Sequence, residues 1–299
     1  MKKSSDHPHP RYCFRRPGAT APSLAFSQSF WALTGRDIEI ARSLEQACEA
    51  GFEYFEVGLR EDRLTATQAL LRQFPLKLIA QGWATSLPEV AVFVDRAVQH
   101  DAVAINLHLG HAYMTEDEAV HLISQVQHLT ASVRLPLLLE THRGRWSQDL
   151  FRTGPVLARL PELAICLDVS HYIVAGETFG GNQHLFQQHV LPLLNRTALI
   201  HGRVSNGHSV QVRLDDPFTD IGTIASLWSR AMADWLKSAP RDAVFVFEPE
   251  LGPPPYAYLD SNGVEGFNRS AETVKLIELA QTVWSTAQGT FTAAPTLGA

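Results

Sequence analysis

Acidic, imidazole and guanidinium side chains recur at the ends of short apolar runs between residues 102 and 250. Each run is short and apolar enough for a buried strand, so the polar residues stand at strand ends. Carboxylates and imidazoles gathered in one place can bind a divalent cation or transfer protons. The candidate residues are, in chain order, His108, Glu140, His142, Asp168, His171, His201, Arg203, Glu248 and Glu250.

Taken singly, each residue has a structural explanation. A strand-end Glu can pair with an Arg, an Asp can cap the next helix, and a His is often a satisfied core residue. Four neighbouring strands that all deliver such groups are different, because buried carboxylates repel one another unless a cation or shared protons neutralise them. A divalent metal held by three carboxylates and one imidazole would neutralise this repulsion most simply. Such a ligand set suits Mn²⁺, Mg²⁺ or Co²⁺ better than a thiolate-dependent zinc site, and Zn²⁺ stays an alternative.

The elements that must position these residues alternate between apolar runs and longer amphipathic stretches, which is typical of repeated βα units. We expect strands over residues 24–30, 52–58, 76–81, 102–108, 136–140, 163–168, 198–204 and 243–250. We expect helices over residues 37–50, 65–73, 89–100, 116–129, 147–160, 184–194, 224–238 and 270–287.

Eight buried-looking strands, each followed by a helix, predict an α/β fold with a single (β/α)8 TIM barrel. A doubly wound sheet is disfavoured because no G-x-G-x-x-G follows the first strand. The carboxyl ends of barrel strands meet at one mouth, which brings the candidate residues together. We expect a flexible N-terminal tail over residues 1–20, the barrel over 21–287 and a flexible C-terminal tail over 288–299.

Composition narrows the function classes. The chain has 299 residues, of which 45% are hydrophobic, as in a soluble globular protein. Its 25 basic and 31 acidic residues give a net charge of −6, which disfavours binding to the negatively charged backbone of nucleic acid. The 3 cysteines are widely spaced, so neither a disulfide framework nor a zinc knuckle is indicated, and a reducing, cytoplasmic location fits. No export signal is recognisable, and no apolar run reaches the roughly 18 residues of a membrane span.

Four motifs carry a resemblance to a known family. They are ETHRGRWSQD (140–149), LDVSH (167–171), IHGRV (200–204) and PELGPPPY (249–256). The chain resembles the xylose isomerase-like TIM-barrel superfamily, the sugar isomerase and epimerase family that also contains endonuclease-IV-like enzymes, from about residue 24 to 285. The resemblance implies metal ligation by Glu140, Asp168, His201 and either Glu250 or Glu248. Glu250 is preferred because its P-E-x-G-P-P-P-Y context looks like a strand-eight motif of the family.

The resemblance also implies how the site works. Glu140 and Glu250, or Glu248 in its place, would form the catalytic pair that removes a proton beside a carbonyl and returns it, through a metal-stabilised enediolate. The expected activity is that of a metal-dependent sugar isomerase or epimerase. The D-x-x-H spacing implies that His171 contacts substrate oxygen. The substrate-binding candidates are His171, His142, Arg203 and His108.

Three other functions stay open. The same chemistry could serve a lyase or hydratase acting on an oxidised sugar or polyol. An endonuclease-IV-like phosphodiesterase would need more metal ligands and a basic DNA-binding face, and a non-catalytic binding protein is the third alternative. The expected partner is a small-molecule sugar rather than nucleic acid or a membrane, and formation of a homo-oligomer stays open. No Gly-rich phosphate loop is present, which favours an unphosphorylated substrate.

Overall fold

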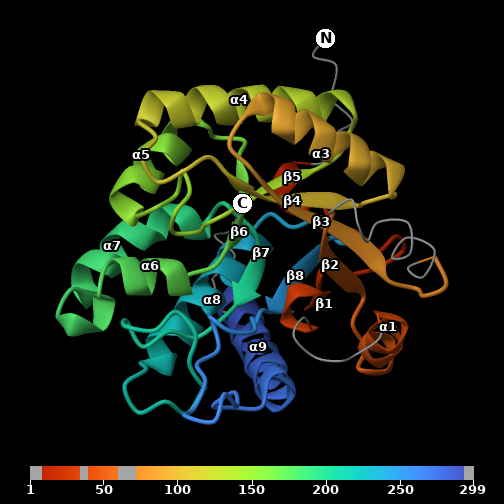
Figure 1. Cartoon of the computed structure of the whole chain (residues 1–299). Coiled ribbons are helices and arrows are strands. Elements are labelled where there is room, and N and C mark those ends of the chain that lie inside the picture. The colour runs from red at the N-terminus through yellow and green to blue at the C-terminus, as the bar shows by residue number, and fades with distance from the viewer. Residues whose placement is uncertain (1–8, 34–39, 60–71, 293–299) are drawn as a thin grey trace.

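Eight parallel strands close into a barrel in the computed structural model, which describes residues 9–33, 40–59 and 72–292 (Figure 1). Each strand pairs with its neighbours in sequence, and β1 pairs with β8 to close the ring. The strands are β1 (Ser23–Ser29), β2 (Tyr54–Gly58), β3 (Lys77–Ala84), β4 (Ala104–Leu109), β5 (Leu137–Glu140), β6 (Ala164–Leu167), β7 (Thr197–Gly202) and β8 (Val244–Pro249).

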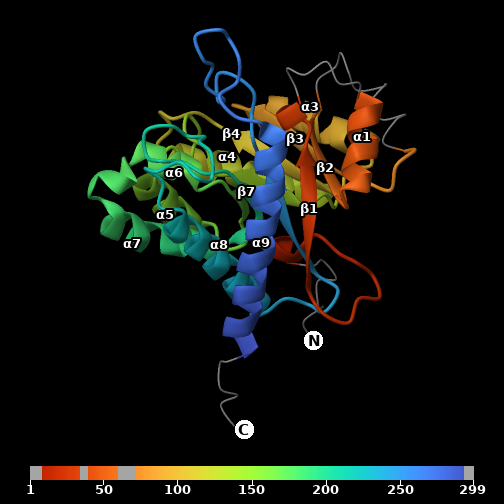
Figure 2. The same ribbon diagram turned by 90° about the horizontal axis from the view of Figure 1, so that it is seen from below.

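Helices surround the barrel, and Figure 2 shows α9 running along its side. They cover the apolar outer face of the sheet, which forms the larger core cluster. The helices are α1 (Ile40–Glu49), α3 (Leu87–Gln99), α4 (Glu116–Ser132), α5 (Leu150–Arg159), α6 (Ser170–Ala175), α7 (Gln183–Leu194), α8 (Ile221–Leu236) and α9 (Arg269–Thr292), with 3-10 turns η1 (Pro10–Tyr12), η2 (Trp31–Leu33) and η3 (Thr178–Gly180).

Side-chain caps fix where several helices begin. Thr115 and Glu118 form a reciprocal capping box at the start of α4, and Asp149 and Asp220 cap α5 and α8. Each cap satisfies backbone N–H groups that the first turn of a helix leaves unpaired. Among the helices of the described ranges, none combines the length and the hydropathy needed to cross a lipid bilayer.

The predicted single (β/α)8 barrel is confirmed. The predicted helix over 65–73 lies almost entirely outside the described residues. The short helix α6 was not predicted, because its six residues follow Asp168 with too little sequence to show a helical period. At the other end of the chain, α9 continues to Thr292, past the predicted start of the C-terminal tail at residue 288.

The N-terminal segment differs from the predicted flexible tail. Residues 1–8 lie outside the described part of the chain, but residues 9–20 contact the barrel. Phe14 is only 2% exposed, and its ring meets that of Tyr54 edge-on at 5.1 Å between centroids. Tyr12 packs in the same way against Trp235 of α8, at 5.4 Å. Prolines and arginines in this segment suggested a tail, whereas tertiary contacts made by two aromatic rings hold it under the barrel.

The barrel interior is layered because alternate residues of each strand point inward. Phe14, Tyr54 and Leu138 belong to an apolar inner cluster that fills the lower part. Cys166 belongs to the same cluster and is fully buried. In β5, Glu140 lies two residues beyond Leu138 and begins the polar upper part of the interior. The strands therefore carry their acidic side chains on top of a packed apolar floor.

Candidate metal centre

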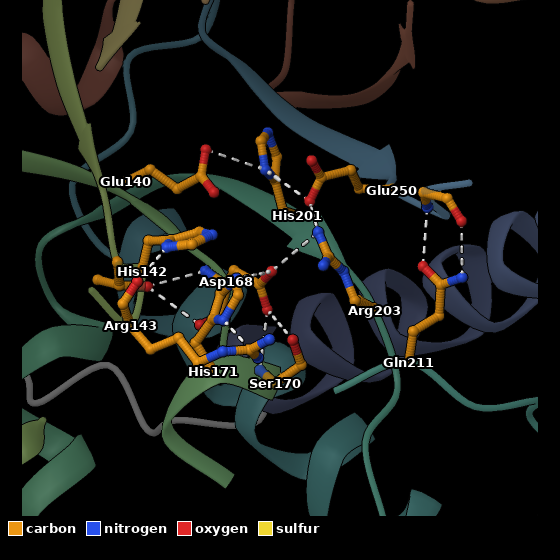
Figure 3. Close-up of polar contacts among 12 residues, drawn as sticks. Glu140, His142, Arg143, Asp168, Ser170, His171, His201, Arg203, Gln211 and Glu250 are labelled. Carbon is orange, nitrogen blue, oxygen red and sulfur yellow. Dashed lines mark hydrogen bonds and ion pairs between the residues drawn. The ribbon is translucent and has the colours of Figure 1, made fainter. Parts of the chain in front are cut away.

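The predicted ligands lie together at the carboxyl ends of neighbouring strands (Figure 3). Glu140 ends β5, Asp168 follows β6, His201 lies in β7 and Glu250 follows β8. All four side chains are buried. This arrangement arises because each strand enters the mouth with an inward-facing polar residue directly after its apolar core positions.

His201 separates the acidic residues into two groups. Its Nδ1 lies 3.4 Å from Oε2 of Glu140 and 3.2 Å from Oε2 of Glu250. Its Nε2 lies 3.3 Å from Oε1 of Glu56 and 3.8 Å from Oε1 of Glu248. Glu250 therefore faces the same side of the imidazole as Glu140, whereas Glu248 joins Glu56 on the other side.

Asn106 of β4 joins the two acidic groups. Its amide Nδ2 donates to Glu56 at 3.1 Å and to Glu140 at 3.0 Å. On the inner side, both carboxyl oxygens of Glu248 lack a hydrogen bond, and burial, followed by the nearby Glu56, raises the pKa of Glu248 well above its usual value. Burial likewise raises the pKa of Glu56. The inner pair therefore favours the protonated acid.

Asp168 is held from both sides. Its Oδ1 accepts hydrogen bonds from the backbone N–H of Ser170 at 2.9 Å and from the Ser170 hydroxyl at 2.6 Å. Its Oδ2 lies 3.3 Å from Nη2 of Arg203 and 3.5 Å from Nε2 of His171. Burial raises the pKa of Asp168 to about 6, and the guanidinium opposes that rise.

Arg203 joins the carboxylates of β6 and β8. Its Nη2 contacts Oε2 of Glu250 as well as Asp168, and the side chain is only 1% exposed. Its guanidinium lies over the rings of Trp31 and Tyr256, 5.4 Å and 4.8 Å from their centroids. Burial alone would lower the pKa of Arg203, but Glu250 and Asp168 raise it. The side chain is therefore a permanent positive charge inside the acidic group.

A row of imidazoles lines the rest of the mouth. The ring centroids of His108 and His142 are 4.7 Å apart, and those of His142 and His171 are 3.8 Å apart. His108 Nε2 lies 2.6 Å from Oε2 of Glu140, and His142 Nε2 lies 3.2 Å from the hydroxyl of Tyr256. Burial, followed by His108, lowers the pKa of His142 to about 3, and burial lowers that of His171 well below its usual value. Both rings are thus neutral.

The outer residues fit a divalent cation. His201 Nδ1, Glu140 Oε1 and Asp168 Oδ2 are buried and lack hydrogen bonds. Ligand atoms of Glu140, Asp168 and His171 lie within 4.8 Å of one another, as do those of Glu140, His201 and Cys166, so either group could hold an ion. Oε1 of Glu56 lies 3.3 Å from Nε2 of His201, on the side of the ring that faces away from these atoms. Without a cation, burial would lower the pKa of His201, yet Cys166 and then the surrounding carboxylates raise it well above its usual value.

The structure brings together most of the predicted site residues. Glu248 is the exception, because it is opposite His201 in the β7–β8 register and so faces the inner group. Sequence reasoning assigned no role to Trp31, Arg143 or Tyr256. Tyr256 ends the PELGPPPY motif and Arg143 lies in the ETHRGRWSQD motif, so these motifs could have indicated both residues. Trp31 lies just beyond β1 and belongs to no motif.

Comparison with known proteins supports the fold. No protein-family model and no curated protein matches the chain. Among solved structures, the probable 3-DHS dehydratase AsbF from Bacillus anthracis is 15% identical, with a TM-score of 0.57 over 86% of this chain and 98% of that one. A D-tagatose 3-epimerase-like protein is 13% identical, with a TM-score of 0.57 over 89% and 99% of the two chains.

A third solved structure is a xylose isomerase-like TIM-barrel protein from Mycobacterium smegmatis in complex with magnesium. It is 10% identical, with a TM-score of 0.56 over 88% of this chain and 98% of that one. Similarity at such low identity concerns the path of the backbone, and it extends over most of each chain. Together with the closed barrel, it shows that this chain shares its fold, a single (β/α)8 TIM barrel, with these three proteins.

Proposed function

We propose that the protein is a divalent-metal-dependent isomerase or epimerase that acts on a sugar or a sugar-derived hydroxycarbonyl compound. One observation carries the proposal. The carboxylates of Glu140 and Glu250 both face Nδ1 of the buried His201, at 3.4 and 3.2 Å, and come from strands on either side of it. A substrate bound at this point would meet a carboxylate from two directions.

Four residues would hold the cation, namely Glu140, Asp168, His201 and Glu250. Their oxygen-rich set favours Mn²⁺ (manganese), Mg²⁺ or Co²⁺. When bound, the cation polarises a carbonyl and an adjacent hydroxyl and so acidifies the C–H bond between them.

Glu140 is the residue best placed to remove that proton. Its Oε1 is buried and has no hydrogen bond. Burial alone would raise the pKa of Glu140, but His108 and His201 outweigh it and hold the pKa well below the usual range, so the group is a carboxylate. Return of the proton to the neighbouring carbon gives an isomer. Return to the opposite face of the same carbon, with Glu250 as the second group, gives an epimer.

The imidazoles and Arg203 orient the substrate. Nε2 of His171 is buried and has no hydrogen bond among the described residues, so this neutral ring can bond a sugar hydroxyl there. His171 is fixed by Asp168 on one side and by Arg143 on the other, whose Nη1 lies 3.2 Å from Nδ1 of His171. Tyr256 fixes His142. The rings are therefore oriented before substrate binds.

A second candidate is a lyase or hydratase, and His108 favours it. Its Nε2 lies 2.6 Å from Glu140, and its ring is partly exposed. In β-elimination, Glu140 would take the proton from one carbon while the C–O bond on the adjacent carbon breaks. His108 could then give a proton to the departing oxygen, so that water leaves and a C=C bond forms.

Metal analysis combined with hydrogen exchange tests the proposal. Purified protein is dialysed against Mn²⁺ and then buffer, and bound metal is measured by mass spectrometry. Sugars are incubated with the protein in heavy water, and deuterium at the carbon next to the carbonyl is followed by NMR. We expect bound Mn²⁺ and exchange with at least one sugar, while a lyase would release an alkene product.

Two variants complete that experiment. Glu140→Gln should abolish exchange while retaining metal, because the amide still offers an oxygen ligand but cannot take a proton. Glu278→Gln is the matched control, since Glu278 is exposed on α9, away from the mouth, and should behave as wild type. Absence of both metal and exchange in the wild-type protein would contradict the proposal.

A further inference from the structure

We infer that the substrate of this site carries an oxyanion group, a carboxylate or a phosphate, which Arg203 and Arg143 bind at the barrel mouth. The inference rests on the proposed function, which it narrows from sugars in general to acidic sugars. It is carried by the donors left open on Arg203, by the surroundings of Arg143 and Arg145, and by the distribution of charge around the cation site.

Arg203 has donors left over inside the site. Only its Nη2 is used, by Asp168 and Glu250. Its Nε and Nη1 are buried and have no hydrogen bond among the described residues. A guanidinium donates hydrogen bonds and accepts none, so these two nitrogens call for an acceptor. The partner that a guanidinium binds best is a carboxylate or a phosphate.

Two more arginines lie around the same mouth. Arg143 contacts His171 and lies over the ring of Tyr256, 5.5 Å from its centroid. Arg145 lies over Trp83, at 5.1 Å, and its buried Nε has no hydrogen bond. In the described part of the chain, neither arginine forms an ion pair with a carboxylate. Both contact neutral rings instead, which hold the side chains in place without using their charge.

The balance of charge around the proposed cation site also favours an anionic substrate. Glu140, Asp168 and Glu250 carry three negative charges, and these are matched by Arg203 and a divalent cation. The charges of Arg143 and Arg145 then remain without a counterpart. A neutral sugar would leave both charges unmatched, and its hydroxyls would need acceptors that arginine does not have. An anionic substrate supplies the missing charge and the acceptors together.

The surroundings of Arg203 also fix its direction. Trp31 and Tyr256 meet edge to face, with centroids 4.9 Å apart, and the guanidinium lies over both rings. Trp31 reaches this place because residue 252 is glycine: a Cβ there would overlap the indole. Gln211 holds that glycine, donating to the carbonyl of Gly252 at 2.9 Å and accepting from its N–H at 2.7 Å (Figure 3). The guanidinium is thus oriented before any ligand arrives.

Matched ligands that differ in one group test the inference. D-glucuronate, D-glucose and D-glucose 6-phosphate, with the corresponding tagatose series, are titrated calorimetrically into Mn²⁺-loaded protein at pH 7.5. We expect at least one acidic ligand to bind about tenfold or more tightly than its neutral counterpart, as expected for a charged hydrogen bond. Preference for the uronate identifies a carboxylate, and preference for the sugar phosphate identifies a phosphate.

Three variants connect this preference to the arginines. Arg143→Met, at a half-buried position without an acidic partner, should keep the fold and lose most of the preference. Arg203→Lys keeps a charge near Asp168 and Glu250 but removes the open guanidinium donors, and it should lose the preference too. Arg230→Met is the control, because Arg230 is exposed on α8, and it should bind like wild type.

Failure of the inference can be told apart from failure of the proposed function. If neutral and acidic ligands bind equally, or if Arg143→Met and Arg203→Lys keep the preference, the inference is overturned, even when sugars still exchange deuterium. If the acidic ligand binds through these arginines but no sugar, neutral or acidic, exchanges deuterium, the proposed proton transfer is overturned and the anion site stands.

Discussion

Nη2 of Arg203 lies 3.3 Å from Oδ2 of Asp168, and the same nitrogen contacts Glu250. One side chain of β7 thereby joins the acids that follow β6 and β8. Because all three groups are buried, their charges interact through protein rather than through water. Removing one partner would leave the others as uncompensated buried charges.

Arg203→Met should therefore destabilise the metal-free protein strongly, by about 3 to 5 kcal/mol. Mn²⁺ should restore more stability to this variant than it adds to wild type, because the cation would replace the lost positive charge. Urea denaturation with chelator and with Mn²⁺ measures both effects, and Arg230→Met serves as the control. Equal stability of the variant and wild type in chelator would contradict this view of the ion pair.

Gln211→Ala should loosen the chain around Gly252. The substitution leaves the buried N–H and C=O of Gly252 without partners, which costs about 1 to 3 kcal/mol in the free energy of unfolding. It should also weaken binding of the preferred acidic ligand, since Trp31 rests on Gly252. Calorimetry and urea denaturation check the two effects. Gln188→Ala, at an exposed position in α7, should change neither.

Gly202→Ala should destabilise the barrel wall. A Cβ at this position in β7 would overlap the ring of Phe247, which is fully buried in β8 and cannot move aside. Overpacking of this kind costs about 1 to 3 kcal/mol. Thermal denaturation gives the comparison. Gly289→Ala in α9, where a Cβ meets open space, should match wild type or gain stability, and a similar loss in both variants would refute the steric explanation.

Asp220 gives a pH-dependent prediction away from the mouth. Hydrogen bonds from the Thr223 hydroxyl at 2.7 Å and from its backbone N–H at 3.0 Å lower the pKa of Asp220. A carboxylate with a lowered folded-state pKa stabilises the protein above its ordinary pKa of about 3.9 and ceases to do so as the pH falls through the lowered value. Asp220→Ala should cost about 1 kcal/mol at pH 7.

The same deficit should shrink in acid. Urea denaturation of wild type and Asp220→Ala at pH 7 and near pH 3 measures it. Asp220→Asn is the matched control, because the amide oxygen still caps α8 but does not titrate in this range. A deficit for Asp220→Ala that is constant with pH would show that the charge of Asp220 contributes nothing.

The sequence predicts those features that depend on local pattern. Buried parallel strands have continuous apolar runs, so the residues at the end of each run, such as Glu140 and Asp168, could be placed at the mouth. Period two put Glu248 and Glu250 on one face and could not choose between them. The structure separates the two side chains, because the β7–β8 register sets Glu248 opposite His201 and Glu250 contacts Arg203.

Features that depend on distant contacts were not predictable. Trp31 and Tyr256 meet only because β1 pairs with β8 when the barrel closes, and nothing near either residue indicates the other. The burial of Phe14 likewise depends on Tyr54, which lies in another strand. Short-range pattern carries little information about such pairs, so the aromatic surroundings of Arg203 emerged only from the folded chain.

Phe14 has a consequence for the opposite end of the barrel. Removing its ring, as in Phe14→Ala, would open a hole beneath the inner apolar cluster. Water drawn upward through a weakened floor would raise the local dielectric constant around the carboxylates. Their mutual repulsion would fall, and with it the attraction that concentrates a cation there. The ring of Phe14 would thus act at a distance on the carboxylates at the mouth, because it limits the access of water from below.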